Sequence, residues 1–249
     1  MDLAALAAKH RARSAAAGPA DVRNIRPSLR EFERYVTTQR AELAVVGELR
    51  RRDPDRGSGA GTTDARAFAK SLADAGCYGV CVCVDEVFGG SLDDLRAVDS
   101  ISPVPVLARG VVLDVQDLYR QRDAGADAFV LYAALHDAAS INALRKAARS
   151  MRAEILVEVT DDASLATALA SEATLIAVSG VDAAGNPDLA AAARRLKQVP
   201  ATRVPILAGG VGSPDELQPL LPDIDAVVLV EPLGLAAPGA VAEPFTTLV

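Results

Sequence analysis

Short apolar runs alternate with longer amphipathic stretches from residue 44 to residue 230. Each short run is apolar on both of its faces, as expected of strands covered on both sides. Alternation of such strands with helical patterns predicts βα units and a parallel sheet. The eight predicted strands are Ala44–Leu49, Tyr78–Val84, Val104–Ala108, Ala128–Leu131, Ile155–Val159, Leu175–Val178, Pro205–Ala208 and Ala226–Val230.

The stretches between these runs have the three- and four-residue apolar spacing of helices. Each begins with Asp or Ser, which are favoured at helix N-caps. The predicted helices are Asp64–Ala75, Asp114–Ala124, Asp137–Ser150, Asp162–Ala170, Asp188–Gln198 and Ser213–Leu221. Eight such units in about 250 residues predict a closed (β/α)8 barrel, which is an α/β fold.

Both ends of the chain depart from the repeat. Residues 1–43 contain two helical patterns, Asp2–Ala16 and Ser28–Thr37, and are predicted to form an N-terminal helical extension. Residues 44–249 are predicted to form the barrel, within a single domain overall. The last stretch contains Pro238, Gly239 and Pro244, so a truncated closing helix is expected.

Composition narrows the class of protein. A net charge of −7 argues against a nucleic-acid surface, which needs a basic excess. No apolar run approaches the ~20 residues of a bilayer span, and the N-terminal stretch lacks the apolar segment of a signal peptide. We therefore expect a cytoplasmic protein, a monomer or homodimer, with neither nucleic-acid nor membrane partners.

Three cysteines, Cys77, Cys81 and Cys83, lie in one apolar run and are expected to be buried, reduced thiols. Cys-x-Cys without further Cys or His is not a zinc site, and no metal-ligand spacing occurs elsewhere. The glycine-rich stretch 57–61 lacks the residues of a P-loop or a dinucleotide site. We expect neither a metal nor a cofactor.

The active site of this fold lies at the carboxyl ends of the strands. Glu48 and Glu158 lie there inside otherwise apolar strands, where an unpaired carboxylate is costly. One interpretation is a buried ion pair with Arg50 or Arg109 that holds the barrel mouth together. The other is a pocket-facing carboxylate oriented by arginine.

Five motifs carry a family resemblance, in order and with consistent spacing. Glu48–Gly57 is similar to Glu-Val-Lys-Arg-x-Ser-Pro-Ser-Lys-Gly, the first-strand motif of indole-3-glycerol phosphate synthase. Phe88–Leu95 resembles that family's Phe-x-Gly-Ser-x-x-Asp-Leu loop. Pro105–Gly110, Ala124–Ala128 and Leu156–Val159 resemble its Pro-Val-Leu-Arg-Lys-Asp, Gly-Ala-Asp and Leu-Val-Glu-Val motifs.

The resemblance implies a carboxy-lyase of tryptophan biosynthesis that closes an indole ring on a phosphorylated anthranilate derivative, releasing CO2 and water. The family's two catalytic lysine positions hold Arg50 and Arg109 here. A guanidinium group binds anions but stays protonated, so it is a poor proton donor. The family's Asn after strand 6 is Ser179, and its Glu-Ser pair at strand 7 is Ala208-Gly209.

The phosphate-binding loops also depart from the family. Gly209 and Gly210 would let backbone amides approach an anion, but Glu231-Pro232 stands where Gly-Ser is expected. Proline has no N–H to donate and a glutamate repels phosphate. In loop 1, Asp53 and Asp55 replace two serines, and an Arg–Asp network within that loop is the simpler interpretation.

Candidate site residues follow from the strand ends and the resemblance. Glu48, Arg109 and Glu158 are the catalytic candidates, Glu158 as acid or base and Glu48 as its orienting partner. The substrate-binding candidates are Arg50, Pro54, Phe88, Leu131, Ser179, Gly209 and Gly210. Arg50 and Arg109 would hold a carboxylate or phosphate, and Phe88 would pack on an aromatic ring. His10 and His136 lack an obvious partner and are expected to be satisfied or surface histidines.

Three functions remain open at this point. The first is a divergent lyase of this family, acting on a carboxylated aryl-amino substrate with altered or reduced activity. The second is a catalytically inactive barrel, a pseudoenzyme that binds a small anionic or aromatic ligand or a partner. The third and weakest is a different phosphate-barrel chemistry such as an isomerase, because no paired acid and base is evident.

Overall fold

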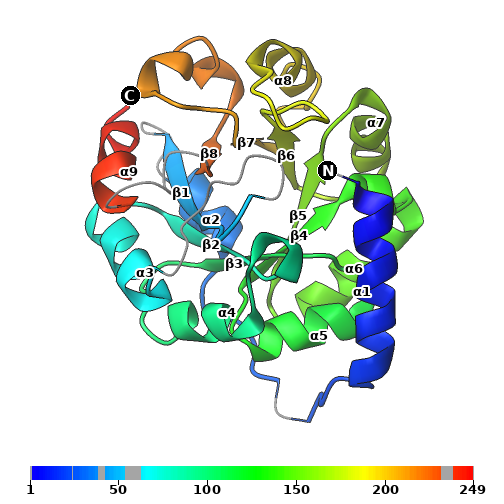
Figure 1. Cartoon of the computed structure of the whole chain (residues 1–249). Helices are drawn as coiled ribbons and strands as arrows, with labels where there is room; N and C mark the ends of the chain where they lie inside the picture. The colour runs from blue at the N-terminus through cyan, green and yellow to red at the C-terminus, as the bar shows by residue number, and fades with distance from the viewer. Residues whose placement is uncertain (1, 24, 39–42, 54–62, 231–237, 249) are drawn as a thin grey trace.

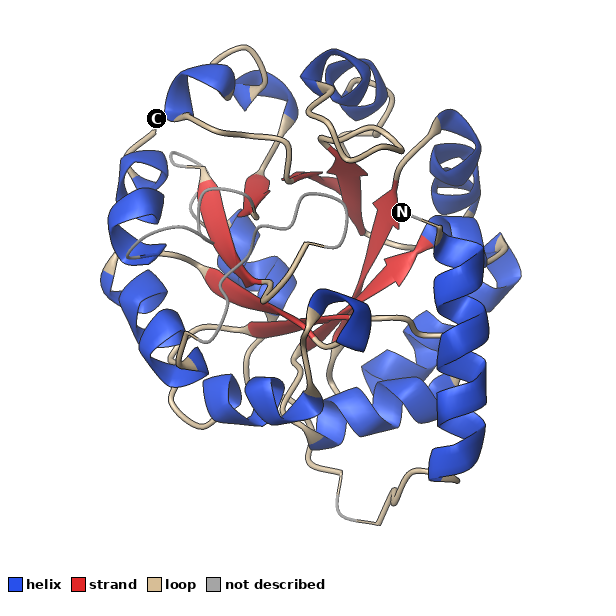
Figure 2. Ribbon diagram, in the orientation of Figure 1, coloured by secondary structure: helices blue, strands red, loops and turns tan. Residues whose placement is uncertain are grey.

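The computed structural model describes residues 2–23, 25–38, 43–53, 63–230 and 238–248. Eight parallel strands form a closed barrel in chain order, and β1 pairs with β8 through Ala44 and Ala226 to complete it. The strands are β1 Ala44–Leu49, β2 Gly79–Cys83, β3 Val106–Arg109, β4 Ala128–Tyr132, β5 Glu154–Val159, β6 Leu175–Ser179, β7 Val204–Ala208 and β8 Ala226–Leu229. Helices surround the strands as a ring (Figures 1 and 2), so the predicted (β/α)8 fold is confirmed.

The outer ring follows most of the predicted helices. It consists of α3 Ala65–Asp74, α4 Leu92–Asp99, α5 Val115–Asp123, α6 Ala138–Ser150, α7 Asp162–Ala170, α8 Leu189–Leu196 and α9 Pro238–Thr246. The sequence pattern did not predict α4, although Ser91 caps it by accepting the Asp94 N–H. The predicted helix Ser213–Leu221 is wrong. Two 3-10 turns, Pro214–Glu216 and Leu221–Asp223, lie in this region, and each has a proline in its first turn.

The closing helix α9 is not shortened by its helix breakers. It has nine residues, as many as α5 and α7. Pro238 occupies the first helical position, where its missing N–H would have no intrahelical partner in any case. Gly239 lies directly against α3, because a Cβ there would stand 2.4 Å from the Ser71 carbonyl oxygen. The glycine therefore permits close helix packing rather than ending the helix.

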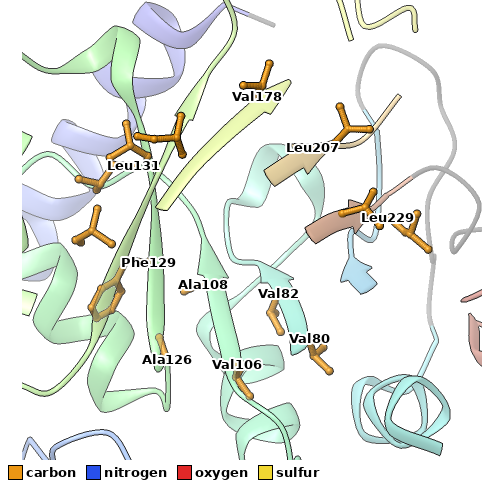
Figure 3. Packing of buried hydrophobic residues seen from close by; sticks show 14 of the residues in the cluster. Val80, Val82, Val106, Ala108, Ala126, Phe129, Leu131, Val178, Leu207 and Leu229 are labelled. Atoms are coloured by element: carbon orange, nitrogen blue, oxygen red, sulfur yellow. The ribbon is translucent and has the colours of Figure 1, made fainter. Parts of the chain in front are cut away.

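Side-chain alternation separates two apolar regions. Every second residue of a strand points outward against the helices, as Val80, Val82, Phe129 and Leu131 do in Figure 3. The intervening residues fill the barrel interior, for example Val46, Leu107 and Leu156. This period of two decides which residues at the strand ends can face the barrel mouth.

The two N-terminal helices contact different parts of the barrel. Helix α2, Phe32–Thr37, places Phe32 and Val36 in the interior cluster, so it fills the amino-terminal end. Helix α1, Leu3–Ala17, runs along one side of the barrel beside α5 (Figure 1), and His10 contacts Asp117 of that helix. In the described ranges, no helix is long and apolar enough to cross a membrane.

Candidate active site at the barrel mouth

Five polar side chains meet at the carboxyl-terminal end of the barrel interior. Each occupies the last or next-to-last inward position of its strand, and together they come from β1, β3, β4, β5 and β6. They are Glu48, Arg109, Tyr132, Glu158 and Ser179, all buried. Strand register places Tyr132 directly beside Glu158. The period of two thus gathers residues up to 131 positions apart, from 48 to 179.

Arg109 lies between two carboxylates at the centre of this group. Its Nε donates to Glu48 Oε2 at 2.6 Å, and its terminal nitrogen donates to Glu158. Glu48 is 1 % exposed, Arg109 2 % and Glu158 8 %. Both glutamates therefore form the expected ion pairs, and Glu158 also lines a cavity with Arg109, whereas Glu48 lies behind the described lining.

Arg50 forms the outer part of the same network. Its Nε donates to Glu48 Oε1 at 2.8 Å, and its terminal nitrogen lies 3.7 Å from Asp53. The guanidinium carbon stands 4.8 Å from the centre of the Phe88 ring, a cation–π distance. Glu48 consequently receives one arginine on each of its oxygens.

These pairs determine the charge states. Burial by itself would raise the pKa of Glu48, but Arg109 and Arg50 outweigh it and hold that pKa below its usual range. Burial opposes the charge on Arg109, yet Glu158 and Glu48 raise its pKa well above the ordinary value. Burial also raises the pKa of Tyr132. At neutral pH, the mouth therefore holds fixed ion pairs around guanidinium groups that retain their protons.

A cavity of about 350 Å³ opens directly above the network. Among the described residues of its lining, the basic side chains are Arg50 and Arg109, and both are already paired. Its acidic side chains outnumber them: Asp53, Glu158, Asp161 and Asp182. Leu3 of α1 and Phe88 add apolar wall. The cavity is thus acidic on balance, with one aromatic ring beneath an arginine.

Three substrate-binding candidates fall outside this cavity. Leu131 points outward from β4 into the packing against the helices (Figure 3), so its assignment is corrected. Gly209 donates its N–H to the Val228 carbonyl at 2.9 Å, so that amide is not aimed at an anion. Gly210 packs against Gly180, where a Cβ would stand 2.1 Å from a carbonyl oxygen. These two glycines serve close backbone packing of β6 and β7.

Other candidates keep a place in the lining. Arg50, Phe88 and Ser179 border the cavity together with Arg109 and Glu158. The Ser179 hydroxyl donates to the Val181 carbonyl oxygen at 3.1 Å. Pro54 lies outside the described residues, as do Asp55, the glycine-rich stretch 57–61 and Glu231-Pro232.

Two further arginines of loop 1, Arg51 and Arg52, are held by structural partners. Arg51 pairs through two nitrogens with Asp94 of α4, at 2.9 and 2.5 Å. Arg52 donates to the carbonyl oxygens of Glu86 and Val87. Of the Arg–Asp network expected within this loop, the described residues provide the Arg50–Asp53 pair, whereas Arg51 and Arg52 tie the loop to the segment after β2.

The site contains residues that the motifs did not indicate. Tyr132 could have been found by alternation, since it follows Ala128 and Val130 on the inward face of β4. Asp182 and Thr160 come from loops after β6 and β5, where no periodic signal exists. Leu3 lines the cavity because α1 packs against the barrel. No local pattern in residues 1–17 predicts that packing.

The histidines and cysteines have structural partners. His10 contacts Asp117 at 2.8 Å, and His136 contacts Ser140 and the Val112 carbonyl oxygen, so both are satisfied as expected. All three cysteines are free and buried, as expected. Among the described residues, no group of three or more His, Cys, Asp or Glu side chains could hold a metal ion.

Comparison with known proteins gives a consistent family match. The family model "Indole-3-glycerol phosphate synthase" matches residues 3–230. An indole-3-glycerol phosphate synthase from a Nocardioides species is 32% identical over 195 residues, covering 76% of this chain and 74% of the relative. The Kineococcus radiotolerans synthase is 33% identical over 200 residues, covering 77% and 71%. Indole-3-glycerol phosphate synthase 2 of Ralstonia nicotianae is 28% identical over 191 residues, covering 75% and 71%.

Proposed function

The chain belongs to the indole-3-glycerol phosphate synthase family, and on that premise we propose that it is a divergent carboxy-lyase with altered or reduced ring-closing activity. Its substrate class is a carboxylated aryl-amine derived from anthranilate. Glu158 serves as acid or base, Glu48 orients the network, and Phe88 packs on the aromatic ring. The proposal assigns these roles to residues that line or support the mouth cavity.

One observation carries this proposal: the Arg109 guanidinium lies between Glu48 and Glu158. An ammonium group at this position could give a proton to a reacting atom, whereas a guanidinium group does not deprotonate in proteins. General acid catalysis typically contributes 10²- to 10⁴-fold. Removal of that proton donor supports a slow reaction rather than an ordinary synthase rate.

The charges of the cavity favour a change in substrate. A phosphate group would meet Asp53, Asp161 and Asp182, while both lining arginines are already neutralised by carboxylates. An aromatic carboxylate meets a lower penalty, because it carries one charge and its ring can stack on Phe88 next to Arg50. We therefore favour a substrate that carries less negative charge than the family's phosphorylated compound.

The test uses purified full-length protein and a panel of anthranilate-derived aryl-amines, with and without the phosphate. Slow CO2 release from at least one member is expected, and Glu158→Gln should abolish it without changing the melting temperature by more than a few degrees. The exposed Glu172→Gln serves as a matched control. Absence of turnover across the whole panel contradicts the lyase proposal.

A variant that restores the family's residue types tests whether the missing catalytic groups or weak substrate binding limit the rate. Arg50→Lys, Arg109→Lys and Ala208→Glu return the family's residue types, and Ala208 lies on the inward face of β7. Gly209 is left unchanged, because its φ of 67° would strain a serine. A gain of about tenfold or more in turnover of the family substrate is expected. An unchanged rate would show that the catalytic groups are not what this barrel lacks.

The second candidate is a ligand-binding barrel without catalysis. The favouring observation is the pairing of Arg50 and Arg109 with carboxylates, because neither guanidinium group can supply a proton for ring closure. In this case an anthranilate-type ligand binds with saturation but is not converted. The same panel, measured by calorimetry and by CO2 release, distinguishes the two candidates.

A further inference from the structure

A second hollow lies beside the mouth cavity, between α1 and the segments that follow β2 and β3. Its volume is about 310 Å³, within the range of small-molecule sites. The turn Glu86–Phe88 separates the two spaces, since Asp85 and Glu86 line this hollow and Phe88 lines the mouth. None of the proposed lyase residues lines it.

Among the described residues, one buried acceptor of this hollow lacks a hydrogen-bond donor, and a buried carboxylate lies beside it. Gln121 of α5 is 4 % exposed, and its Oε1 has no hydrogen-bond partner in the described part of the chain. Asp85 is 2 % exposed, and its Oδ2 accepts the Val111 N–H at 3.1 Å. Its Oδ1 lies 3.7 Å from the Arg13 guanidinium, longer than a hydrogen bond. A buried acceptor such as Gln121 Oε1 is uncommon and points to a missing donor.

Gly110 packs closely beside Asp85, Gln121 and Val84. A Cβ at this position would lie 3.7 Å from Asp85 Oδ1 and 3.4 Å from Gln121 Nε2. It would also stand 2.5 Å from a methyl group of Val84, closer than real Cβ contacts. A side chain at position 110 would therefore displace Val84, which forms part of the apolar wall of the hollow.

The other polar groups of the wall already have partners. Asp117 contacts His10 at 2.8 Å and Arg120 at 3.1 Å, and Arg120 also donates to Ser14. The lining carries four carboxylates and two arginines: Asp85, Glu86, Asp93, Asp117, Arg13 and Arg120. This excess of negative charge favours a cation. Val84, Leu92 and Val111 give the hollow an apolar wall.

We propose that this hollow binds a small primary amine with an apolar body. An ammonium group has three donors and no acceptor, which suits the unpartnered Gln121 oxygen and the buried Asp85 carboxylate. The ammonium donates to Asp85 Oδ1 and Gln121 Oε1, and the apolar body packs on Val84, Leu92 and Val111. Burial raises the pKa of Asp85, and a bound ammonium would compensate the buried charge. The site is independent of the lyase proposed at the mouth.

The test is calorimetric titration of the full chain with 2-phenylethylamine, which is protonated at neutral pH. The matched probe is 2-phenylethanol, which has the same body and no charge. Saturable binding of the amine is expected, and the alcohol should bind about tenfold more weakly or worse, since hydrogen bonds to charged groups are the stronger ones. Equal affinities, or no saturable amine binding up to millimolar concentration, overturn the proposal.

Two variants locate the amine. Asp85→Asn keeps an acceptor for the Val111 N–H but removes the charge, and should weaken amine binding about tenfold or more. Gln121→Met removes an oxygen that has no partner, so it should weaken binding about threefold while the melting temperature is maintained. Unchanged affinity in both variants overturns the proposal even if the amine binds elsewhere.

Two controls complete the design. Glu86 is at the rim with a side chain 78% exposed, so Glu86→Gln should change amine affinity by about twofold at most. Glu158→Gln alters the mouth and should leave amine binding unchanged. Loss of amine binding in Glu158→Gln would place the amine at the mouth and contradict the separate site, whatever the outcome for lyase activity.

Discussion

Two buried arginine–carboxylate networks lie at opposite ends of the barrel. At the amino-terminal end, Asp127 receives Arg30 at 2.7 Å, Arg122 at 3.1 Å, the Ser28 hydroxyl at 2.7 Å and the Val106 N–H at 2.9 Å. At the mouth the order is reversed, because one arginine, Arg109, lies between two carboxylates.

The difference shows that arginine–carboxylate pairs can have different roles at the two ends of one barrel. The lower network ties the segment around Ser28 to the start of β4 through a carboxylate whose acceptors are used on both oxygens. The upper network borders a cavity of about 350 Å³ and lies where (β/α)8 enzymes place catalysis. We therefore assign stability to the Asp127 network and ligand chemistry to the Arg109 network.

Removal of Asp127 should have the largest effect on stability. Asp127→Ala leaves Arg30 and Arg122 without their buried partner and is expected to lower the free energy of unfolding by about 3–5 kcal/mol. Urea denaturation measures this. Asp99→Ala is the control, since this partner of Arg30 has a side chain 36% exposed and should contribute about 1 kcal/mol or less. Equal losses would contradict the distinction between the two partners.

Removal of Arg109 should destabilise less and in a pH-dependent manner. Arg109→Met is expected to lower the free energy of unfolding by about 2–4 kcal/mol at pH 7, because Arg50 still neutralises part of Glu48. Without Arg109, burial raises the pKa of Glu48, so this carboxyl takes up a proton as pH falls. The loss should therefore be smaller at pH 5 than at pH 7. A loss independent of pH would show that charge compensation is not the role of Arg109.

Strand β5 carries a glutamate at each end: Glu158 pairs with Arg109, whereas no arginine among the described residues pairs with Glu154. Burial raises the pKa of Glu154 to about 7, and the nearby Glu33 carboxylate adds to the effect. Because the folded pKa is above the unfolded value, the folded state binds the extra proton between about pH 4.5 and pH 7. Stability should fall as pH rises through this window, by about 2 kcal/mol.

Glu154→Gln tests this assignment. Glutamine keeps an acceptor for the Glu33 N–H, which Glu154 accepts at 3.0 Å, and has no proton to lose. Urea denaturation between pH 4.5 and pH 7.5 should give a flatter stability profile than the unmodified chain. The same fall with pH in the variant would assign the titration to another group.

The smallest expected effect concerns the glycines of loop 7. Gly209 has a φ of 67°, so Gly209→Ala should destabilise by about 1 kcal/mol. Gly212→Ala is the matched control in the same loop, because its φ is not positive and a Cβ there meets only Glu216 at 3.7 Å. That control should change stability by about 0.5 kcal/mol at most. Equal effects would contradict a conformational role for Gly209.

Much of the fold was predictable from apolar periodicity. All eight strands lie within two residues of their predicted ends, because strands buried on both faces leave continuous apolar runs. Helix breakers were less informative. Pro238 and Gly239 lie within α9, where the first helical position and close packing on α3 accommodate them. In residues 214–222, by contrast, a helix was predicted, and the structure has two 3-10 turns that each contain a proline in the first turn.

The site was predictable only in part. The motifs indicated Glu48, Arg109 and Glu158, and the structure brings these three together. A strand end placed one residue too early selected Leu131 instead of Tyr132, and one residue reverses the face. Asp182 and the docking of α1 depend on tertiary packing, which leaves no local signal in the sequence.

The central claim is that the paired guanidinium groups at the mouth cannot supply a proton for ring closure. The most direct measurement is single-turnover formation of indole-3-glycerol phosphate from the family substrate, with the Nocardioides synthase assayed in parallel. The account predicts that this chain is slower by about 10²-fold or more. A rate equal to that of the relative would contradict it.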